Sequence, residues 1–160
     1  MRCIAYSKFD VLNGYGSRVV VWLSGCTHNC DGCFSPNSHN PSNGDMIDET
    51  FLTKIKEDLS KNFIKGLTWS GGDPLHKRNV DQVLKFSSEV KHLFPDKDIW
   101  LYTGYTIEQI YEDPLRKPIL GVIDYLVDGK YNQNLQPVQF RGSSNQNIYK
   151  ITNGIGDIVD

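Results

Sequence analysis

Short β-rich runs alternate with helical patterns along this chain, and that alternation limits its fold more than any other feature. Four strands are predicted at the apolar runs 19–23, 67–69, 99–102 and 120–127. The apolar spacing predicts helices from about Asp48 to Leu59 and from Val80 to Phe94, and a capping box of Thr106 and Gln109 predicts a third. Strands that alternate with helices indicate right-handed βαβ units and a parallel sheet.

The length of the chain restricts which parallel architecture it can form. At 160 residues, without internal repeats or a break in composition, residues 1–160 are expected to form a single α/β domain. A complete eight-fold barrel needs about 250 residues, so we expect a partial, open parallel β/α barrel. The polar segment from about 131 to 160 is expected to be an extension with a loop and a short terminal strand pair.

Every predicted strand is followed by a polar or glycine-rich turn. The cysteine-rich segment 24–34 follows the first strand, Gly71-Gly72-Asp73 the second, Thr103-Gly104 the third and Asp128-Gly129 the fourth. Ligands of parallel α/β proteins gather at the carboxyl ends of the strands. We therefore expect these four segments to share one rim.

Three of the four cysteines, Cys26, Cys30 and Cys33, fall within eight positions. A disulfide framework spreads its cysteines along the chain, whereas this clustering indicates one coordination site. Thiolates favour iron–sulfur clusters and zinc. An electron-transfer [4Fe–4S] cluster takes four cysteines, so three would leave one iron open to a substrate or cofactor.

The competing interpretation is a structural zinc site with His28 or His39 as the fourth ligand. On the cluster interpretation, His28 is instead expected to hydrogen-bond a cluster sulfur, because as a ligand it would close the open iron. The isolated Cys3 is expected to be a small core residue outside the site.

Net charge and the distribution of apolar residues limit where the protein is expected to be located and which partners it is expected to bind. A net charge of -2 gives no basic footprint for nucleic acid, and no apolar run is long enough to cross a bilayer. The N-terminus lacks the pattern of a secretory signal, so a cytoplasmic location is expected, where thiols stay reduced.

The cysteine spacing Cys26-x3-Cys30-x2-Cys33 resembles the cluster motif of the radical S-adenosylmethionine superfamily. The surrounding sequence is similar to the activating proteins of anaerobic ribonucleoside-triphosphate reductase from about Asn13 to Gln146. The fragments that carry this similarity are 13–16, 24–30, 70–75 and 141–146. One position departs from the superfamily pattern: Gly32 stands before the third cysteine, where many members have an aromatic residue, and Phe34 follows that cysteine instead.

The resemblance implies a [4Fe–4S] cluster whose open iron binds the amino and carboxylate groups of S-adenosylmethionine. One electron from a donor such as flavodoxin then cleaves the cofactor to methionine and a 5'-deoxyadenosyl radical. In the resembled family, this radical removes a hydrogen atom from a backbone glycine of the reductase large subunit, a glycyl-radical protein. A homodimer within a complex with the reductase is compatible with this scheme, and no further catalytic side chain is required.

The resemblance and the shared rim together indicate which residues bind the cofactor. The expected set is Gly32, Cys33, Phe34, Ser70, Gly71, Gly72, Asp73, Thr103, Asp128 and Lys130. The glycine-rich segment is expected to contact the methionine amino group, with Asp73 as a carboxylate suited to that cation. Asp128 and Lys130 are expected at the ribose and the carboxylate, and Arg141 can serve as a cofactor or partner contact.

Three alternatives remain open at the level of the sequence. Activases of pyruvate formate-lyase and small radical enzymes of deazapurine synthesis also use three-cysteine clusters, although the Arg141–Gln146 fragment favours the reductase branch. The third alternative is a non-enzymatic zinc-binding module.

Overall fold

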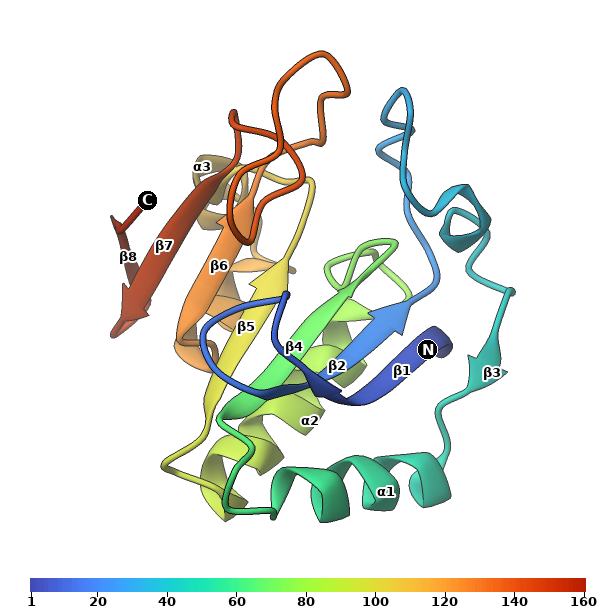
Figure 1. The fold of residues 1–160 in the computed structure, drawn as a ribbon, viewed down its shortest axis with the longest axis vertical. Helices are drawn as coiled ribbons and strands as arrows, with labels where there is room; N and C mark the ends of the chain where they lie inside the picture. The colour runs from blue at the N-terminus through green and yellow to red at the C-terminus, as the bar shows by residue number, and fades with distance from the viewer.

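Eight strands form one sheet in the computed structural model, which describes residues 1–160 (Figure 1). The strands are β1 (Arg2–Asp10), β2 (Arg18–Leu23), β3 (Asp45–Met46), β4 (Gly66–Gly71), β5 (Asp98–Tyr102), β6 (Tyr125–Asp128), β7 (Asn147–Thr152) and β8 (Ile155–Ile158). Their order across the sheet is β3-β1-β2-β4-β5-β6-β7-β8.

The four central strands, β2, β4, β5 and β6, run parallel, as the sequence predicted. The flanking strands do not: β1 and β3 on one side, and β7 and β8 on the other, pair antiparallel. The sheet is therefore mixed and open, with β3 and β8 at its two edges. The prediction of a parallel sheet holds for the centre of the molecule alone, and closure into a barrel is not established.

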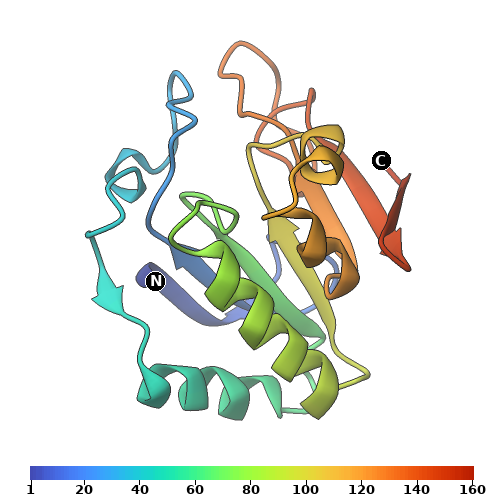
Figure 2. The same ribbon diagram turned by 180° about the vertical axis from the view of Figure 1, so that it is seen from behind.

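Three α-helices, α1 (Glu49–Leu59), α2 (Val80–Leu93) and α3 (Ile107–Glu112), cover one face of the sheet (Figure 2). Asp48 caps α1 by accepting a hydrogen bond from the Phe51 amide, and the predicted capping box of Thr106 and Gln109 opens α3. All three predicted helices are thus confirmed. Two short 3₁₀ helices, η1 (Pro36–Ser38) and η2 (Lys117–Gly121), lie in the connections.

Two segments differ from the sequence prediction. Residues 2–10 form the long strand β1, which was not predicted, because its mixed exposure leaves no clear alternation of apolar and polar residues. The predicted strand over 120–127 begins only at Tyr125, because η2, with a proline in its first turn, occupies the start of that range. The predicted terminal strand pair is confirmed as β7 and β8.

The main hydrophobic core lies between the sheet and the helices and contains 25 buried residues. Along β5, Ile99 and Leu101 belong to this core, whereas Trp100 belongs to a smaller cluster with Val127 and Ile148. Alternate side chains of a strand point to opposite faces, so the smaller cluster marks the face without helices. That face carries the site. No helix combines the length and the apolar character that a bilayer crossing requires.

Candidate functional site

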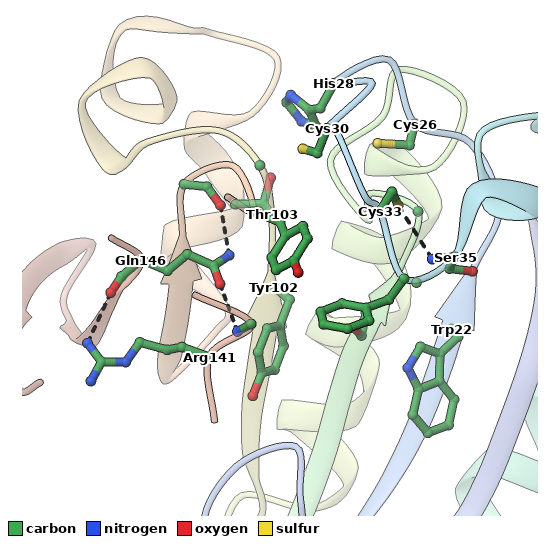
Figure 3. A pocket seen from close by; sticks show the side chains of 18 of the residues that line it. Trp22, Cys26, His28, Cys30, Cys33, Ser35, Tyr102, Thr103, Arg141 and Gln146 are labelled. Carbon is green, nitrogen blue, oxygen red and sulfur yellow. Dashed lines mark hydrogen bonds between the residues drawn. The ribbon is translucent and has the colours of Figure 1, made fainter. Parts of the chain in front are cut away.

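The three clustered cysteines lie on the loop that follows β2 and line one cavity of about 460 Å³ (Figure 3). All three are free thiols and are partly buried. Figure 3 shows them at one end of the cavity, with Trp22 and Tyr102 further inside. The expected grouping of Cys26, Cys30 and Cys33 around one space is thus what the structure shows.

The cysteine loop begins with a glycine in a backbone conformation that other residues rarely adopt. Gly25 has φ +101°, and a Cβ atom there would lie 2.9 Å from the His76 ring. Two backbone hydrogen bonds then fix the start of the loop, from Gly25 N to Ser38 O at 2.6 Å and from Cys26 N to His39 O at 3.2 Å. The first cysteine is thereby held next to the returning end of the same loop.

The ends of neighbouring parallel strands supply much of the cavity wall. Of the residues expected to bind the cofactor, Cys33, Phe34, Ser70, Gly71, Gly72 and Thr103 line the cavity. Gly32, Asp73, Asp128 and Lys130 do not. The turns after β2, β4 and β5 therefore line one cavity, as expected. From the turn after β6, only Gly129 lines it, and the expected Asp128 and Lys130 do not.

The glycine-rich turn after β4 packs directly against the start of the cysteine loop. Gly71 has φ +106°, and a Cβ atom there would lie 2.2 Å from the Leu23 backbone nitrogen. The Gly72 amide donates to Leu23 O at 2.7 Å, and the Asp73 amide donates to Gly25 O at 2.8 Å. Glycine is required because the two backbones approach so closely.

The Asp73 carboxylate lies behind the cavity wall and is fully buried. It accepts hydrogen bonds from His28 Nε2 at 2.6 Å, from the Thr103 hydroxyl at 2.9 Å, from Gly104 N at 3.1 Å and from Leu75 N at 2.7 Å. Both oxygens of the carboxylate thus accept hydrogen bonds from the protein. The structure thus gives Asp73 partners other than the amino group of a cofactor.

Asp128 and Lys130 also differ from their expected placement. Asp128 is 2% exposed, and its carboxylate accepts hydrogen bonds from the Ile107 amide at 2.8 Å and from the Asn147 amide at 3.3 Å. Burial raises the pKa of this carboxyl. Asp128 therefore ties β6 to α3 and β7, while Lys130 is exposed outside the cavity. A ribose contact for Asp128 has no support in this geometry.

Gly32 and Phe34 join the cysteine loop to the segment after β6. A Cβ atom at Gly32 would lie 2.2 Å from the Gln133 side chain, and the Phe34 ring packs against Tyr131 with centroids 4.7 Å apart. Phe34 is nevertheless 78% exposed. It therefore lines the cavity with a ring that is open to solvent.

Several cavity residues were not predicted from the sequence. Trp22 and Tyr102 line it because they point to the helix-free face of their strands, which the alternation of side chains along a strand would have revealed. Gln146 also lines it, as does His39, which the sequence indicated only as a possible zinc ligand, and both the Tyr102 hydroxyl and His39 Nε2 are buried without a hydrogen-bond partner. Arg141 lines the cavity but directs its guanidinium to Gln146 O and Asp160.

The thiols and their surroundings fit an iron–sulfur cluster. Burial raises the pKa of the Cys26 thiol to about 11, which disfavours a free thiolate, whereas a hydrogen bond from the His28 backbone amide favours the thiolate form. The Ser35 amide donates to Cys33 Sγ at 3.4 Å. Amide donors of this kind stabilise thiolate ligands and tune iron–sulfur clusters.

The two histidines proposed as the fourth ligand of a zinc site differ in their surroundings: His39 lines the cavity with its Nε2 unpartnered, whereas His28 is engaged elsewhere. No group of three or more His, Cys, Asp and Glu side chains is arranged to hold a single metal ion. His28, one of the two proposed fourth ligands, is hydrogen-bonded to Asp73. The expected hydrogen bond from His28 to a cluster sulfur is likewise replaced at its Nε2 atom by the Asp73 contact.

Comparison with known proteins agrees with this geometry. The family described as "4Fe-4S single cluster domain" matches residues 12–149. The chain is therefore an iron–sulfur protein with a domain of the radical S-adenosylmethionine type.

The particular family follows from similar full-length sequences. Anaerobic ribonucleoside-triphosphate reductase-activating protein of Pasteurella multocida is 44% identical over 95% of this chain and 99% of its own length. The proteins of the same name from Enterobacteria phage T4 and Escherichia coli K12 are 40% and 35% identical, over 91% of this chain and 92% and 96% of their own lengths. This chain belongs to the family of anaerobic ribonucleoside-triphosphate reductase-activating proteins.

Proposed function

We propose that this chain activates an anaerobic ribonucleoside-triphosphate reductase by generating a glycyl radical on it. The observation that carries the proposal is the cavity that three cysteines and a glycine-rich turn line together, in a chain of the reductase-activating family. Its proposed partners are the reductase large subunit and an electron donor such as flavodoxin, in the cytoplasm. A homodimer within the complex with the reductase is part of the same proposal.

Cys26, Cys30 and Cys33 would hold a [4Fe–4S] cluster with one iron free of protein ligands. When bound, this cluster supplies the electron that splits S-adenosylmethionine into methionine and a 5'-deoxyadenosyl radical, the species that takes a hydrogen atom from the reductase glycine. The protein's own contribution is to bind, orient and shield the reactants.

The backbone of Ser70, Gly71 and Gly72 is the proposed binding surface for the methionine end of the cofactor. Glycine lets a ligand approach the main chain without a clash with a Cβ atom. Thr103 and Phe34 line the same cavity and would flank the remainder of the cofactor. The Phe34–Tyr131 contact lies on the same side of the cavity as the segment after β6 and would pack against a bound cofactor.

The open sheet suits a protein substrate. The strand edges do not close on each other, and the cavity is bounded by the cysteine loop on one side and by residues of the segment 131–146 on the other. A partial barrel of the radical S-adenosylmethionine type would leave such a mouth accessible from the side. A glycine on a flexible segment of a large enzyme could then enter it.

The test is an anaerobic activation assay with reconstituted protein. Together with a reductant, S-adenosylmethionine and the reductase, the protein should produce a glycyl-radical signal in electron paramagnetic resonance. Cys26→Ala, Cys30→Ala and Cys33→Ala should each abolish both cofactor cleavage and the radical, whereas Cys3→Ala should retain them.

Each contrary result removes a defined part of the proposal. Cofactor cleavage without a radical on the reductase would overturn the substrate assignment and direct the assay to pyruvate formate-lyase or to small deazapurine precursors. About one zinc per chain without acid-labile sulfide, in anaerobically purified protein, would overturn the radical chemistry altogether.

A further inference from the structure

The buried Asp73 carboxylate connects three separate turns at the site. Its partners are His28 in the cysteine loop after β2, Thr103 and Gly104 in the turn after β5, and Leu75 in its own turn after β4. We call His28, Asp73, Thr103 and Gly104 the Asp73 network. A hydrogen bond to a charged group is stronger than one between neutral groups, and burial strengthens it further.

His28 is the member that reaches into the cysteine loop. Its side chain is 8% exposed, and its ring packs edge-on against Tyr105 with centroids 4.5 Å apart. A Cβ atom at Gly104 would lie 2.4 Å from the His28 ring, so the glycine makes room for it. Three neighbours, Asp73, Gly104 and Tyr105, therefore fix the orientation of the imidazole.

Tyr105 is itself held in place. The Arg116 guanidinium donates to the Tyr105 hydroxyl at 2.8 Å and lies 4.2 Å from the ring centroid. Arg116 also donates to Leu75 O at 2.9 Å, so it connects Tyr105 with the turn after β4, which contains Asp73. The surroundings of His28 are thus built from side chains that have few alternative positions.

The consequence for the cysteine loop follows from where His28 stands. It lies between Cys26 and Cys30, its backbone amide faces the Cys26 thiol, and Asn29 after it lies in the left-handed region at φ +50°, which asparagine tolerates better than other side chains. Apart from the His28–Asp73 contact, the segment from Thr27 to Cys33 has one backbone hydrogen bond, from Cys33 N to Cys30 O at 3.2 Å. The His28–Asp73 hydrogen bond also fixes the distance from the cysteines to Gly71 and Gly72, because Asp73 follows those glycines directly.

We infer that the His28–Asp73 hydrogen bond holds the cysteine loop against the glycine-rich turn, and that Asp73 is a positioning residue, not a contact of the cofactor amino group. The inference rests on the proposed function, since it concerns how the cluster ligands face the cofactor surface. It agrees with the backbone contact that the resemblance implies for the amino group, and it gives the Asp73 carboxylate protein partners instead.

The test compares His28→Leu, which removes the donor, with His28→Gln, whose amide can replace Nε2–H. Asp31→Asn is the control, because Asp31 is an exposed carboxylate of the same loop. Two measurements need neither reductase nor turnover: hydrogen exchange of the amides of residues 26–33 in metal-free protein, and the rate at which reconstituted protein loses iron to a chelator. Loss of a charge-assisted hydrogen bond should accelerate both about tenfold or more in His28→Leu.

We expect His28→Gln and Asp31→Asn to stay within about twofold of the wild type. The reduced cluster of His28→Leu should also give an electron paramagnetic resonance spectrum that differs from the wild-type spectrum. Wild-type exchange and iron loss in His28→Leu would overturn the inference. Equal defects in His28→Leu and His28→Gln would also overturn it, because they would show that the ring, not the hydrogen bond, matters.

Asp73→Asn separates positioning from direct contact with the cofactor. If Asp73 acts through His28, the double variant Asp73→Asn/His28→Leu should lose iron no faster than the worse single variant. If Asp73 instead contacted the amino group, Asp73→Asn would lose cofactor affinity while His28→Leu kept it, and the inference would fail. Should Asp73→Asn not fold, the two His28 variants decide alone. A missing glycyl radical on the reductase would contradict the proposed function without changing any of these readouts.

Discussion

Cys3 shows how surroundings separate a core thiol from a ligand. It is 5% exposed and belongs to the main hydrophobic core, and its Sγ donates to Ala5 O at 2.9 Å. Burial raises its pKa from 9.0 to about 11. Cys3 is therefore a neutral packing group at physiological pH, in agreement with the role expected from its isolation in the sequence.

This placement predicts a pH-dependent stability in metal-free protein. The folded state holds the Cys3 proton more tightly than the unfolded state. The protonated thiol therefore adds to the free energy of unfolding below pH 9, and this stabilisation is lost as the pH rises through about 11. A pKa difference of this size corresponds to up to about 3 kcal/mol. Denaturant unfolding between pH 8 and 11 should show a steeper loss of stability in the wild type than in Cys3→Ala.

Ile47→Val is a suitable control for the Cys3 experiment. Ile47 is a 6% exposed member of the same core, and its truncation should cost about 1 kcal/mol. This variant removes packing without removing a titrating group, so its stability should fall with pH as steeply as that of the wild type. Parallel curves for the wild type and Cys3→Ala would contradict the assignment.

At the scale of the elements, the contact between β2 and the turn after β4 depends on Gly71. A Cβ atom there would overlap the Leu23 backbone, and its φ of +106° disfavours any other residue. Gly71→Ala should therefore destabilise the protein by about 1–3 kcal/mol and weaken S-adenosylmethionine binding as the strand ends separate. Thermal unfolding and equilibrium binding measure the two effects.

Gly121→Ala is the matched control for Gly71. Nothing lies within 4 Å of the Cβ atom that it would introduce, and Gly121 lies in η2, outside the cavity. Its stability should stay within about 0.5 kcal/mol of the wild type, with unchanged cofactor binding. An equally mild effect of Gly71→Ala would show that the two backbones can move apart freely.

The fully buried Arg18 ties three strands and the loop between β1 and β2 together. It pairs with Asp98 at 2.5 Å and donates to the Thr68 hydroxyl at 2.7 Å and to Tyr15 O at 2.9 Å. Arg18→Met leaves the Asp98 carboxylate without its cation, which should cost about 3–5 kcal/mol. Urea unfolding measures this, with Arg78→Met, a change at an exposed arginine, as the control.

A cost below about 1 kcal/mol for Arg18→Met would mean that water replaces the guanidinium without penalty. Both arginine variants are compared with the same wild-type protein, so the difference between their free energies of unfolding does not depend on how stable the wild type is.

The elements show which features a sequence can predict. Helices α1 and α2 follow from apolar stripes, and the central strands are recognisable because they are buried on both faces. The strand β1 has mixed exposure and lacks such a signal. The cysteine spacing predicts the site because ligands close in sequence must be close in space.

The destinations of Asp73 and Asp128 could not be predicted in the same way. Asp73 receives donors from the loop after β2 and the turn after β5, and Asp128 receives them from α3 and β7. Such contacts depend on how distant elements pack, so a carboxylate at a strand end looks the same in the sequence whether it faces a ligand or the protein.

At the scale of the whole molecule, the hydrophobic core and the proposed cluster site are separate. The 25 residues of the main core lie between the sheet and the helices, whereas Cys26, Cys30 and Cys33 belong to a loop that extends beyond the end of β2. None of these three cysteines belongs to either hydrophobic cluster. The sheet therefore has its own source of stability, unlike that of small zinc domains, which unfold without their metal.

This separation predicts that removal of iron leaves the fold intact. After anaerobic chelation, the far-ultraviolet circular dichroism spectrum should stay unchanged and thermal unfolding should remain cooperative, with Tm lowered only by the loss of the bound cluster. Faster hydrogen exchange should be confined to residues 26–44, because β2 and β3, the strands that flank this loop, keep their backbone partners. Exchange that accelerates throughout β4 and β5 would instead mean that the cluster organises the parallel sheet, and that the cysteine loop belongs to the folding unit of the core.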